Sequence, residues 1–277
     1  MATIAAAPLR KLTAQLTEKG KVQYQMPVGD NSLALNPLIG KTLTLKHSGL
    51  ISCCHCGRKT KKSYSQGFCY PCMQKLAQCD MCIMKPETCH YHLGTCREPE
   101  WGERHCMIPH YVYLANTSGL KVGITRHTQI PTRWIDQGAT QALPLFKVQS
   151  RIQSGLVEVA LAEFIADKTN WRAMLKGNAE PIALKEKALA LKGSIAEKLA
   201  DSQLSYGAEA IASLDEPIVE LHYPVEQYPI KITSLNLDKT PEIAGTLMGI
   251  KGQYLIFDTG VINIRKYTSY HVSVSYN

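Results

Sequence analysis

Two Cys-x2-Cys pairs constrain the fold of this chain more than any other feature of its sequence. The pairs are Cys53/Cys56 and Cys69/Cys72, with twelve residues between them. Each pair can present two thiolates from one short loop, and four thiolates brought together make a closed tetrahedral site for a structural Zn²⁺ ion. Reduced cysteines packed as small apolar residues are the alternative, but they do not account for the paired spacing. The sequence therefore predicts a zinc ribbon.

Further cysteines and histidines follow the ribbon and predict a second zinc ion. All ten cysteines lie within residues 53–106. In a reducing compartment, clustered cysteines are expected to hold metal instead of forming disulfides. We expect the ligands of the second ion to be the most regular quartet, with Cys89 or His92 as the substitute for one member: Cys79, Cys82, Cys96 and Cys106.

Composition places the chain among globular proteins. Its 277 residues are 45% hydrophobic and 19% charged, which is enough to bury a core in two or three units. No apolar stretch has the length needed to cross a bilayer, and the first 30 residues lack the apolar core of a secretory signal. We therefore expect a cytoplasmic protein that does not partner a membrane.

The positive charge is concentrated around the ribbon. The net charge is +8, and residues 31–79 contain no Asp or Glu. Cations and an aromatic ring share the loop between the cysteine pairs: Arg58, Lys59, Lys61, Lys62 and Tyr64. Cations attract phosphates and an aromatic ring can stack on a base, so nucleic acid is the expected partner. An ordinary solvated lysine loop is the alternative.

The pattern of polar and apolar residues divides the chain into five parts. They are an N-terminal leader and strands at 1–49, a zinc-binding region at 50–108, an α/β domain at 109–178, a connecting helix at 179–205 and a small β-barrel at 206–277. Because the two N-terminal strands expected at 32–37 and 41–46 have no partners nearby in sequence, we expect both to pair with the C-terminal strands. The predicted fold class is α+β, with the metal-binding and central units inserted between the two halves of the barrel.

Alternation and turn residues predict the strands of the barrel. The expected C-terminal strands are 218–223, 230–235, 243–250, 253–257, 260–264 and 270–276.

The central part resembles the GIY-YIG nuclease superfamily. Residues 110–115 and 120–125 resemble the paired strands that name the superfamily, through Tyr113 and Gly123. Arg133 and Glu158 resemble its helix arginine and its metal-binding glutamate. The resemblance implies that Tyr113 helps to activate water, that Arg133 steadies the scissile phosphate and that Glu158 holds Mg²⁺.

Two positions depart from that superfamily. Lys121 stands where the second motif begins with tyrosine, and Gln137 stands where a histidine often follows the arginine. These departures favour a domain that has lost hydrolysis and kept a phosphate-binding surface, with Lys121, Arg126 and Arg133 as contacts. The turn at Trp134 can either read a nucleotide or close a packing corner, and the sequence leaves both open.

Taken whole, the chain resembles an uncharacterised bacterial family in which a four-cysteine zinc ribbon precedes a degenerate GIY-YIG-like domain. The sequence segments that show this resemblance are 94–99, 121–126, 133–139 and 249–254. It implies a fold and no activity.

The sequence favours a non-catalytic, zinc-dependent nucleic-acid-binding protein. RNA is favoured over DNA because no helix has the base-reading pattern of a major-groove binder. Two alternatives remain open. One is a magnesium-dependent endonuclease that uses Tyr113, Arg133 and Glu158. The other is a scaffold protein whose basic loop binds an acidic protein partner.

Overall fold

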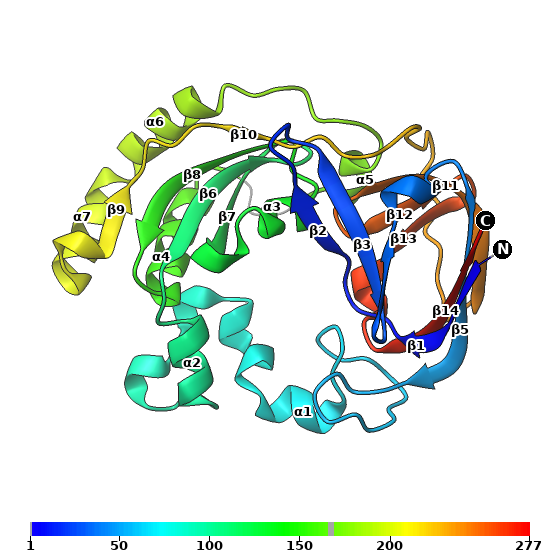
Figure 1. Cartoon of the computed structure of the whole chain (residues 1–277). Coiled ribbons are helices and arrows are strands. Elements are labelled where there is room, and N and C mark those ends of the chain that lie inside the picture. Colours follow the sequence, from blue (N-terminus) through cyan, green and yellow to red (C-terminus); the bar gives the residue numbers. More distant parts are fainter. Residues whose placement is uncertain (1, 166–168) are drawn as a thin grey trace.

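Strands from both ends of the chain form the largest sheet. The computed structural model describes residues 2–165 and 169–277. The six strands of this sheet run antiparallel to their neighbours in the order β1-β14-β5-β11-β12-β13 (Figure 1). Their bounds are Ala2–Pro8 (β1), Tyr270–Tyr276 (β14), Thr42–Ile51 (β5), Glu242–Lys251 (β11), Tyr254–Phe257 (β12) and Gly260–Asn263 (β13).

Alternation along β5 and β14 explains why the two chain ends meet. Leu43 and Leu45 on β5 and Val272 and Val274 on β14 are 0% exposed, and Val274 lies opposite Leu45. Because successive side chains of a strand point to opposite faces, alternating apolar residues put one face of each strand into the same apolar core. Of the two N-terminal strands predicted to pair with the C-terminal strands, the one expected at 41–46 does so in β5. The prediction was wrong for 32–37, because residues 32–34 pair with another N-terminal strand.

The sheet is open, so the closed barrel expected from the sequence was wrong. Strands β1 and β13 stand at opposite edges of the sheet. Residues 230–235, expected as a strand, contribute a single bridge from Ser234 to Val261. Residues 218–223 form only β10 (Val219–Glu220), which joins a different sheet. Without these two strands the C-terminal part cannot close on itself.

The N-terminal residues that were expected to form a leader also form strands. A three-stranded sheet has the order β2-β3-β4, with bounds Thr13–Leu16, Val22–Val28 and Asn31–Ala34. Along β3 the side chains of Val22, Tyr24, Met26 and Val28 are buried. This strict period of two is the pattern of a half-buried strand.

The central sheet has the order β10-β8-β6-β7, and β9 pairs with the same edge of β8 as β10, at residues 146–148. Its remaining strands are His110–Asn116 (β6), Leu120–Arg126 (β7), Gln141–Val148 (β8) and Ile211–Ser213 (β9). The hairpin of β6 and β7 matches the expected strands at 110–115 and 120–125. Strand β8 was not expected, because its continuous apolar run contains Pro144 and shows no alternation.

Helices accompany the central sheet. Helices α4 and α6 pack against its core, and the expected connecting helix at 179–205 is divided between α6 and α7. The bounds are Thr132–Asp136 (α3), Arg151–Ala162 (α4), Trp171–Met174 (α5), Leu184–Ser194 (α6) and Ala196–Tyr206 (α7). No helix in the described part of the chain is both long and apolar enough to span a bilayer.

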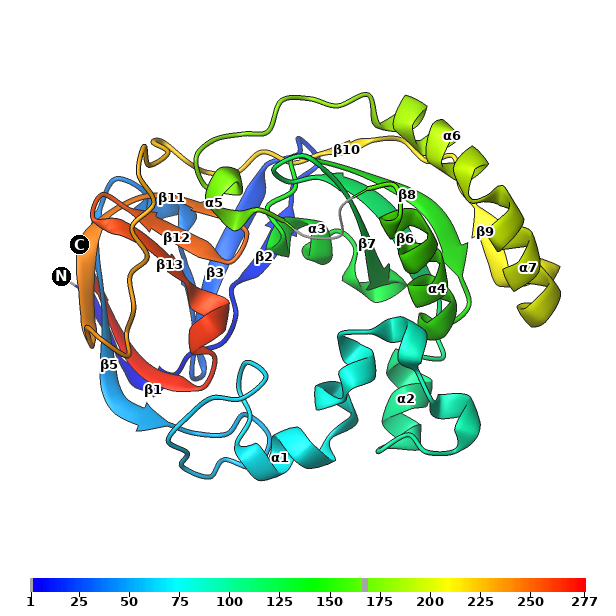
Figure 2. The same ribbon diagram turned by 180° about the vertical axis from the view of Figure 1, so that it is seen from behind.

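Residues 52–108, here called the cysteine-rich region, connect β5 to β6. Both views show this region running from one sheet to the other (Figures 1 and 2). It contains short helices and 3₁₀ turns: α1 (Tyr70–Lys75), η2 (Ala77–Cys79), η3 (Met81–Ile83), η4 (Pro86–Thr88), η5 (Tyr91–Leu93) and α2 (Pro99–His105). Among the described residues, the three buried apolar clusters of the protein include no member of this region.

A polar corner joins the central unit to both ends of the chain. The Asp136 carboxylate, 4% exposed, accepts hydrogen bonds from Lys11 Nζ and Gln253 Nε2, both at 2.8 Å. Gly252 has φ +61°, and a Cβ there would lie 3.1 Å from the Asp136 carbonyl oxygen. Trp134 is 2% exposed. Of the two readings of this turn, the structure shows the packing corner.

Candidate metal centre and basic loop

The four cysteines of the predicted ribbon come together. The sulfur atoms of Cys53, Cys56, Cys69 and Cys72 all lie within 4.8 Å of one another, and the Cys56 and Cys69 sulfurs are 3.7 Å apart. A tetrahedral Zn²⁺ with Zn–S bonds of about 2.3 Å needs sulfurs about 3.8 Å apart. The spacing and the all-thiol donor set therefore fit zinc.

Each cysteine pair lies on a turn that the sequence favours. Gly57 donates its N–H to the Cys53 carbonyl at 2.9 Å, and Cys53 donates to the Arg58 carbonyl at 2.9 Å. Gly57 has φ +71°, a left-handed conformation that glycine adopts without steric cost. In the second pair, Cys69 precedes α1 and Cys72 lies in its first turn.

Backbone N–H groups stabilise thiolates in this cluster. Burial raises the pKa of Cys53, but backbone N–H groups of Cys56, Cys69 and His55 lower it to about 6. The backbone N–H of Arg58 lowers the pKa of Cys56. Burial and the neighbouring sulfurs raise the pKa of Cys72. A divalent cation would remove that repulsion, because it favours the thiolate form of all four ligands.

The basic loop between the pairs is exposed. The side chains of Arg58, Lys59, Lys61 and Lys62 all lie in solvent. The Lys62 ammonium lies 5.3 Å from the centre of the Tyr64 ring, and that ring meets Tyr70 edge-on with centroids 5.5 Å apart. Tyr70, which is 49% exposed, was not part of the predicted contact set. The loop therefore presents cations beside two aromatic rings.

Of the three residues that resemble nuclease residues, Arg133 and Glu158 both lie within electrostatic reach of Tyr113. Tyr113 is 0% exposed, and its hydroxyl donates to Gln137 Oε1 at 2.8 Å. Burial raises the Tyr113 pKa to about 12, while the charge and hydrogen bond of Arg133 act to lower it and the charge of Glu158 raises it. A Cβ on Gly123 would lie 2.7 Å from the Tyr113 ring. The tyrosine is thus enclosed, and its hydroxyl is already bonded.

The other expected phosphate contacts differ in exposure. Lys121 is only 4% exposed, and its amine donates to Thr169 Oγ1 at 3.5 Å, which leaves it little surface for a phosphate. Arg126 is half-buried at the end of β7, and burial lowers its pKa while Cys106 raises it.

Arg265 lies near Arg133 in the structure. It belongs to the turn η8 (Ile264–Tyr267), and its guanidinium donates to Gln66 Oε1. Burial and the charge of Arg133 lower the Arg265 pKa, while Asp136 raises it. No sequence signal connects two arginines more than a hundred residues apart, because only the packing of the two units brings them together.

The later cysteines are arranged differently from the predicted quartet. Cys82, Cys89, Cys96 and Cys106 line one cavity. Cys79 does not line it, and its thiol instead neighbours Ser65 and Cys54. His92 is exposed and is also absent from that lining. A mixed group of Asp80, Cys82 and His90 gathers its ligand atoms within 4.8 Å.

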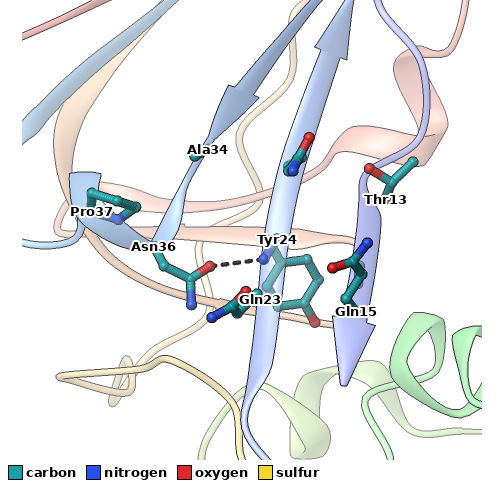
Figure 3. Close-up of a pocket in the computed structure, with 9 residues that line it drawn as sticks. Thr13, Gln15, Gln23, Tyr24, Ala34, Asn36 and Pro37 are labelled. Atoms are coloured by element: carbon teal, nitrogen blue, oxygen red, sulfur yellow. Dashed lines mark hydrogen bonds between the residues drawn. The ribbon is translucent and has the colours of Figure 1, made fainter. Parts of the chain in front are cut away.

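A pocket of about 350 Å³ opens on the sheet of β2, β3 and β4 (Figure 3). Asn36 Oδ1 accepts a hydrogen bond from the Tyr24 backbone N–H at 2.8 Å. The remaining lining is uncharged: Thr13, Ala14, Gln15, Gln23, Gln25, Ala34 and Pro37. A lining without cations does not match a polyphosphate ligand.

Fold and site define a mixed α+β protein with a four-cysteine cluster that can hold a metal ion. A family model described as "Protein of unknown function (DUF2797)" matches residues 40–272, and the chain belongs to that family. The comparisons with curated proteins and with solved structures found no match.

Proposed function

We propose that the protein is a zinc-dependent nucleic-acid-binding protein that favours RNA over DNA and uses the loop at residues 58–64. One observation carries the proposal. Four sulfurs with the spacing of a tetrahedral ion lie at the base of an exposed loop with four cations and no acidic residue. Zinc would hold the loop in one conformation, so that phosphates meet cations that are already arranged.

The aromatic rings beside the loop favour an unpaired strand. Tyr64 is half-buried against Tyr70, and a cation lies over its face. Bases of a single strand are free to stack on such rings, whereas bases inside a duplex are not. This composition supports single-stranded or looped RNA as the ligand.

A second phosphate contact is proposed around Arg133. The Arg133 charge lowers the pKa of Arg265, so the two guanidinium groups lie close enough to repel each other. A phosphate between them would relieve that repulsion. Arg126, half-buried on the same unit, is a further contact of this proposal, while Lys121 is left with a minor role by its burial.

The test is binding of a fluorescent RNA oligonucleotide, measured by anisotropy over a range of salt concentrations. Changing Lys59, Lys61 and Lys62 together to Ala should weaken binding at least about tenfold and reduce the slope of log K against log salt by about 2. The matched control removes the same charge from three exposed lysines elsewhere: Lys187, Lys231 and Lys239. Equal affinity of the two triple variants would refute the loop as the contact surface.

The same assay separates the other partners. A DNA oligonucleotide of equal sequence should bind more weakly than the RNA. An acidic protein partner, as in the scaffold hypothesis, would instead be indicated if neither oligonucleotide bound at physiological salt while an acidic polypeptide bound in a salt-sensitive way.

A magnesium-dependent endonuclease is the second candidate function. It is favoured by the reach of Arg133 and Glu158 to the Tyr113 hydroxyl. The burial of Tyr113 and its bond to Gln137 weigh against activation of water by that hydroxyl. If this candidate is correct, the protein should nick nucleic acid when Mg²⁺ or Mn²⁺ is added. Glu158→Ala should abolish that nicking and leave the zinc content unchanged.

A further inference from the structure

Four cysteines outside the first cluster surround a second small cavity. Cys82, Cys89, Cys96 and Cys106 line a space of about 10 Å³, roughly what one water-sized sphere occupies. Cys89 and Cys106 are 6% and 5% exposed. The residues come from separate turns and from the end of α2, so the cavity is the point at which the second half of the cysteine-rich region converges.

The thiols in this cavity lie close enough to interact with one another. Cys106 interacts with Cys89 and Cys96, and Cys82 interacts with Cys89 and Cys106. A divalent cation at the centre would be shared by all four sulfurs.

The cavity is lined closely around Cys96. A Cβ added to Gly102 would lie 3.4 Å from the Cys96 sulfur and 2.9 Å from the Tyr91 ring. The sulfurs are nevertheless more loosely gathered than in the first cluster, since among the described residues no three of them lie within 4.8 Å of one another. An ion would have to draw them together.

A half-buried arginine supplies the countercharge. Arg151 donates from Nη2 to the Ile83 carbonyl at 2.6 Å and from Nε to the Cys82 carbonyl at 3.4 Å. Its guanidinium also interacts with the thiols of Cys106 and Cys82. A cation held beside thiols is stabilised when those thiols are ionised, as they are when they bind a metal.

We propose that Cys82, Cys89, Cys96 and Cys106 bind a second structural Zn²⁺ ion, which fastens α4 to the cysteine-rich region. Four thiolates and one divalent cation leave a net charge of −2. Arg151 and Arg126, which both act on the Cys106 thiol, offset that charge. The proposal replaces Cys79 of the sequence-level quartet with Cys89.

The mixed group of Asp80, Cys82 and His90 is the competing site. Asp80 Oδ2 accepts a bond from Arg97 Nε at 2.6 Å. The other carboxylate oxygen of Asp80 accepts from the Cys82 backbone N–H at 3.4 Å, where it caps η3. His90 Nδ1 lies 2.7 Å from Thr95 Oγ1. These side chains already hold the local turns, so the four thiols are the better ligand set.

Helix α4 lies directly on the proposed site. The Arg151 backbone N–H donates to the Cys106 carbonyl at 2.8 Å. One turn later, a Cβ on Gly155 would lie 2.4 Å from the Glu87 backbone nitrogen in η4. The metal would therefore fix the start of the helix that carries Glu158.

The first test is the zinc content of the purified protein and its variants, measured by plasma mass spectrometry. The wild type should hold about two zinc ions per chain, and Cys89→Ser or Cys106→Ser should leave about one. Cys79→Ser is the matched control and should keep about two. One ion in the wild type, or loss of an ion from Cys79→Ser but not from Cys89→Ser, would overturn the proposal. The proposal would also be overturned if Asp80→Asn or His90→Ala lost one zinc ion while Cys96→Ser kept both.

The second test needs no variant, so misfolding cannot confuse it. Cys79, Cys82 and Cys96 are all half-buried in the native protein. Brief alkylation of the metal-loaded wild type, mapped by peptide mass spectrometry, should modify Cys79 and spare Cys82 and Cys96 until a chelator is added. Equal modification of all three before chelation contradicts the site. Because neither test uses nucleic acid, their outcome is independent of the proposed RNA binding.

Discussion

The six-stranded sheet and the cysteine-rich region are stabilised in different ways. In the sheet, alternating residues such as Leu45 and Val274 are 0% exposed and belong to one large apolar cluster. In the cysteine-rich region, the buried hydrophobic residues belong to none of the apolar clusters and are mainly cysteines: Cys53, Cys69, Cys89 and Cys106, with Leu76 and Ala77. One part of the chain is therefore held by apolar burial, and the other needs its thiols to be bridged.

This difference explains why the two regions should respond to different perturbations. Apolar burial weakens when a large side chain is removed, whereas a tetrathiolate site fails when one ligand is lost. The basic loop belongs to the second class, because residues 58–64 lie between the two cysteine pairs. Its conformation should therefore follow metal content more than the stability of the sheets.

Loss of a zinc ligand should have the largest effect. The apparent binding free energy of a structural zinc site is about 10–16 kcal/mol. Cys69→Ser should remove one zinc ion and abolish amide protection across residues 52–76, while β5 and β14 keep theirs in hydrogen exchange. Cys54→Ser, next to a ligand in sequence, should change neither metal content nor exchange. Protection of residues 52–76 that survives complete metal removal would break the comparison.

Truncation of a buried side chain in the six-stranded sheet should lower stability without loss of zinc. Leu45→Ala removes a fully buried side chain and should lower the free energy of unfolding by about 2–5 kcal/mol in urea, with zinc content unchanged. Lys46→Ala on the same strand removes an exposed ion pair with Glu242 and should cost less than about 1 kcal/mol. A loss of zinc from Leu45→Ala would show that the regions are coupled.

Two helical glycines can be substituted to test the contact between α4 and the cysteine-rich region, with Gly193 as the control. Gly155→Ala places a methyl group against the η4 backbone and should destabilise the protein by about 1–3 kcal/mol. Gly193→Ala in α6 meets nothing within 4 Å and should stabilise it by about 0.5–1 kcal/mol, as expected for an exposed helix. Thermal or urea unfolding measures both. A stabilised Gly155→Ala would mean that η4 does not pack on α4.

The last prediction concerns a buried lysine at the end of β11. Lys251 is 0% exposed, donates to the Gly177 carbonyl at 2.8 Å, and has its pKa lowered to about 8 by burial. An unfolded lysine titrates near pH 10.4. Between pH 8 and 10 the unfolded state binds more protons, so stability rises with pH by at most about 1.4 kcal/mol per pH unit.

Replacing the lysine with an uncharged side chain tests that sign. Lys251→Met should remove this part of the pH dependence, measured as the difference between wild type and variant in urea unfolding at pH 8 and pH 9.5. The burial of neighbouring tyrosines, such as Tyr223, works in the opposite direction above pH 10, since their pKa values are raised. An identical slope in both proteins would place the Lys251 amine in water.

Local patterns carried most of what could be predicted. The first cysteine cluster and the β6–β7 hairpin follow from spacing and alternation within about twenty residues. Strand β8 was missed because an apolar run buried on both faces has no period to detect. The expected barrel failed because the sequence pattern at 230–235 does not reveal whether a strand finds a partner.

The second group of thiols shows how far the residues of a site can be predicted from the sequence. Regular spacing favoured Cys79, yet the fold places that thiol beside Ser65 and puts Cys89 in the shared cavity. Spacing orders ligands along the chain but does not say which way a turn faces. Cys89 ends η4 and Cys106 ends α2, and both of these elements contact α4, which lies far along the chain.

The sequence alone determined the ligand pairs of the first cluster, the acid-free basic loop between them and the strands that alternate. Each of these depends on neighbours within one turn or strand, so short-range geometry suffices. Only the tertiary structure decided that Tyr113 is buried, that Asp136 joins Lys11 to Gln253 and that Arg133 lies near Arg265. Those contacts join residues far apart in the chain, and only packing of the separate units brings them within reach.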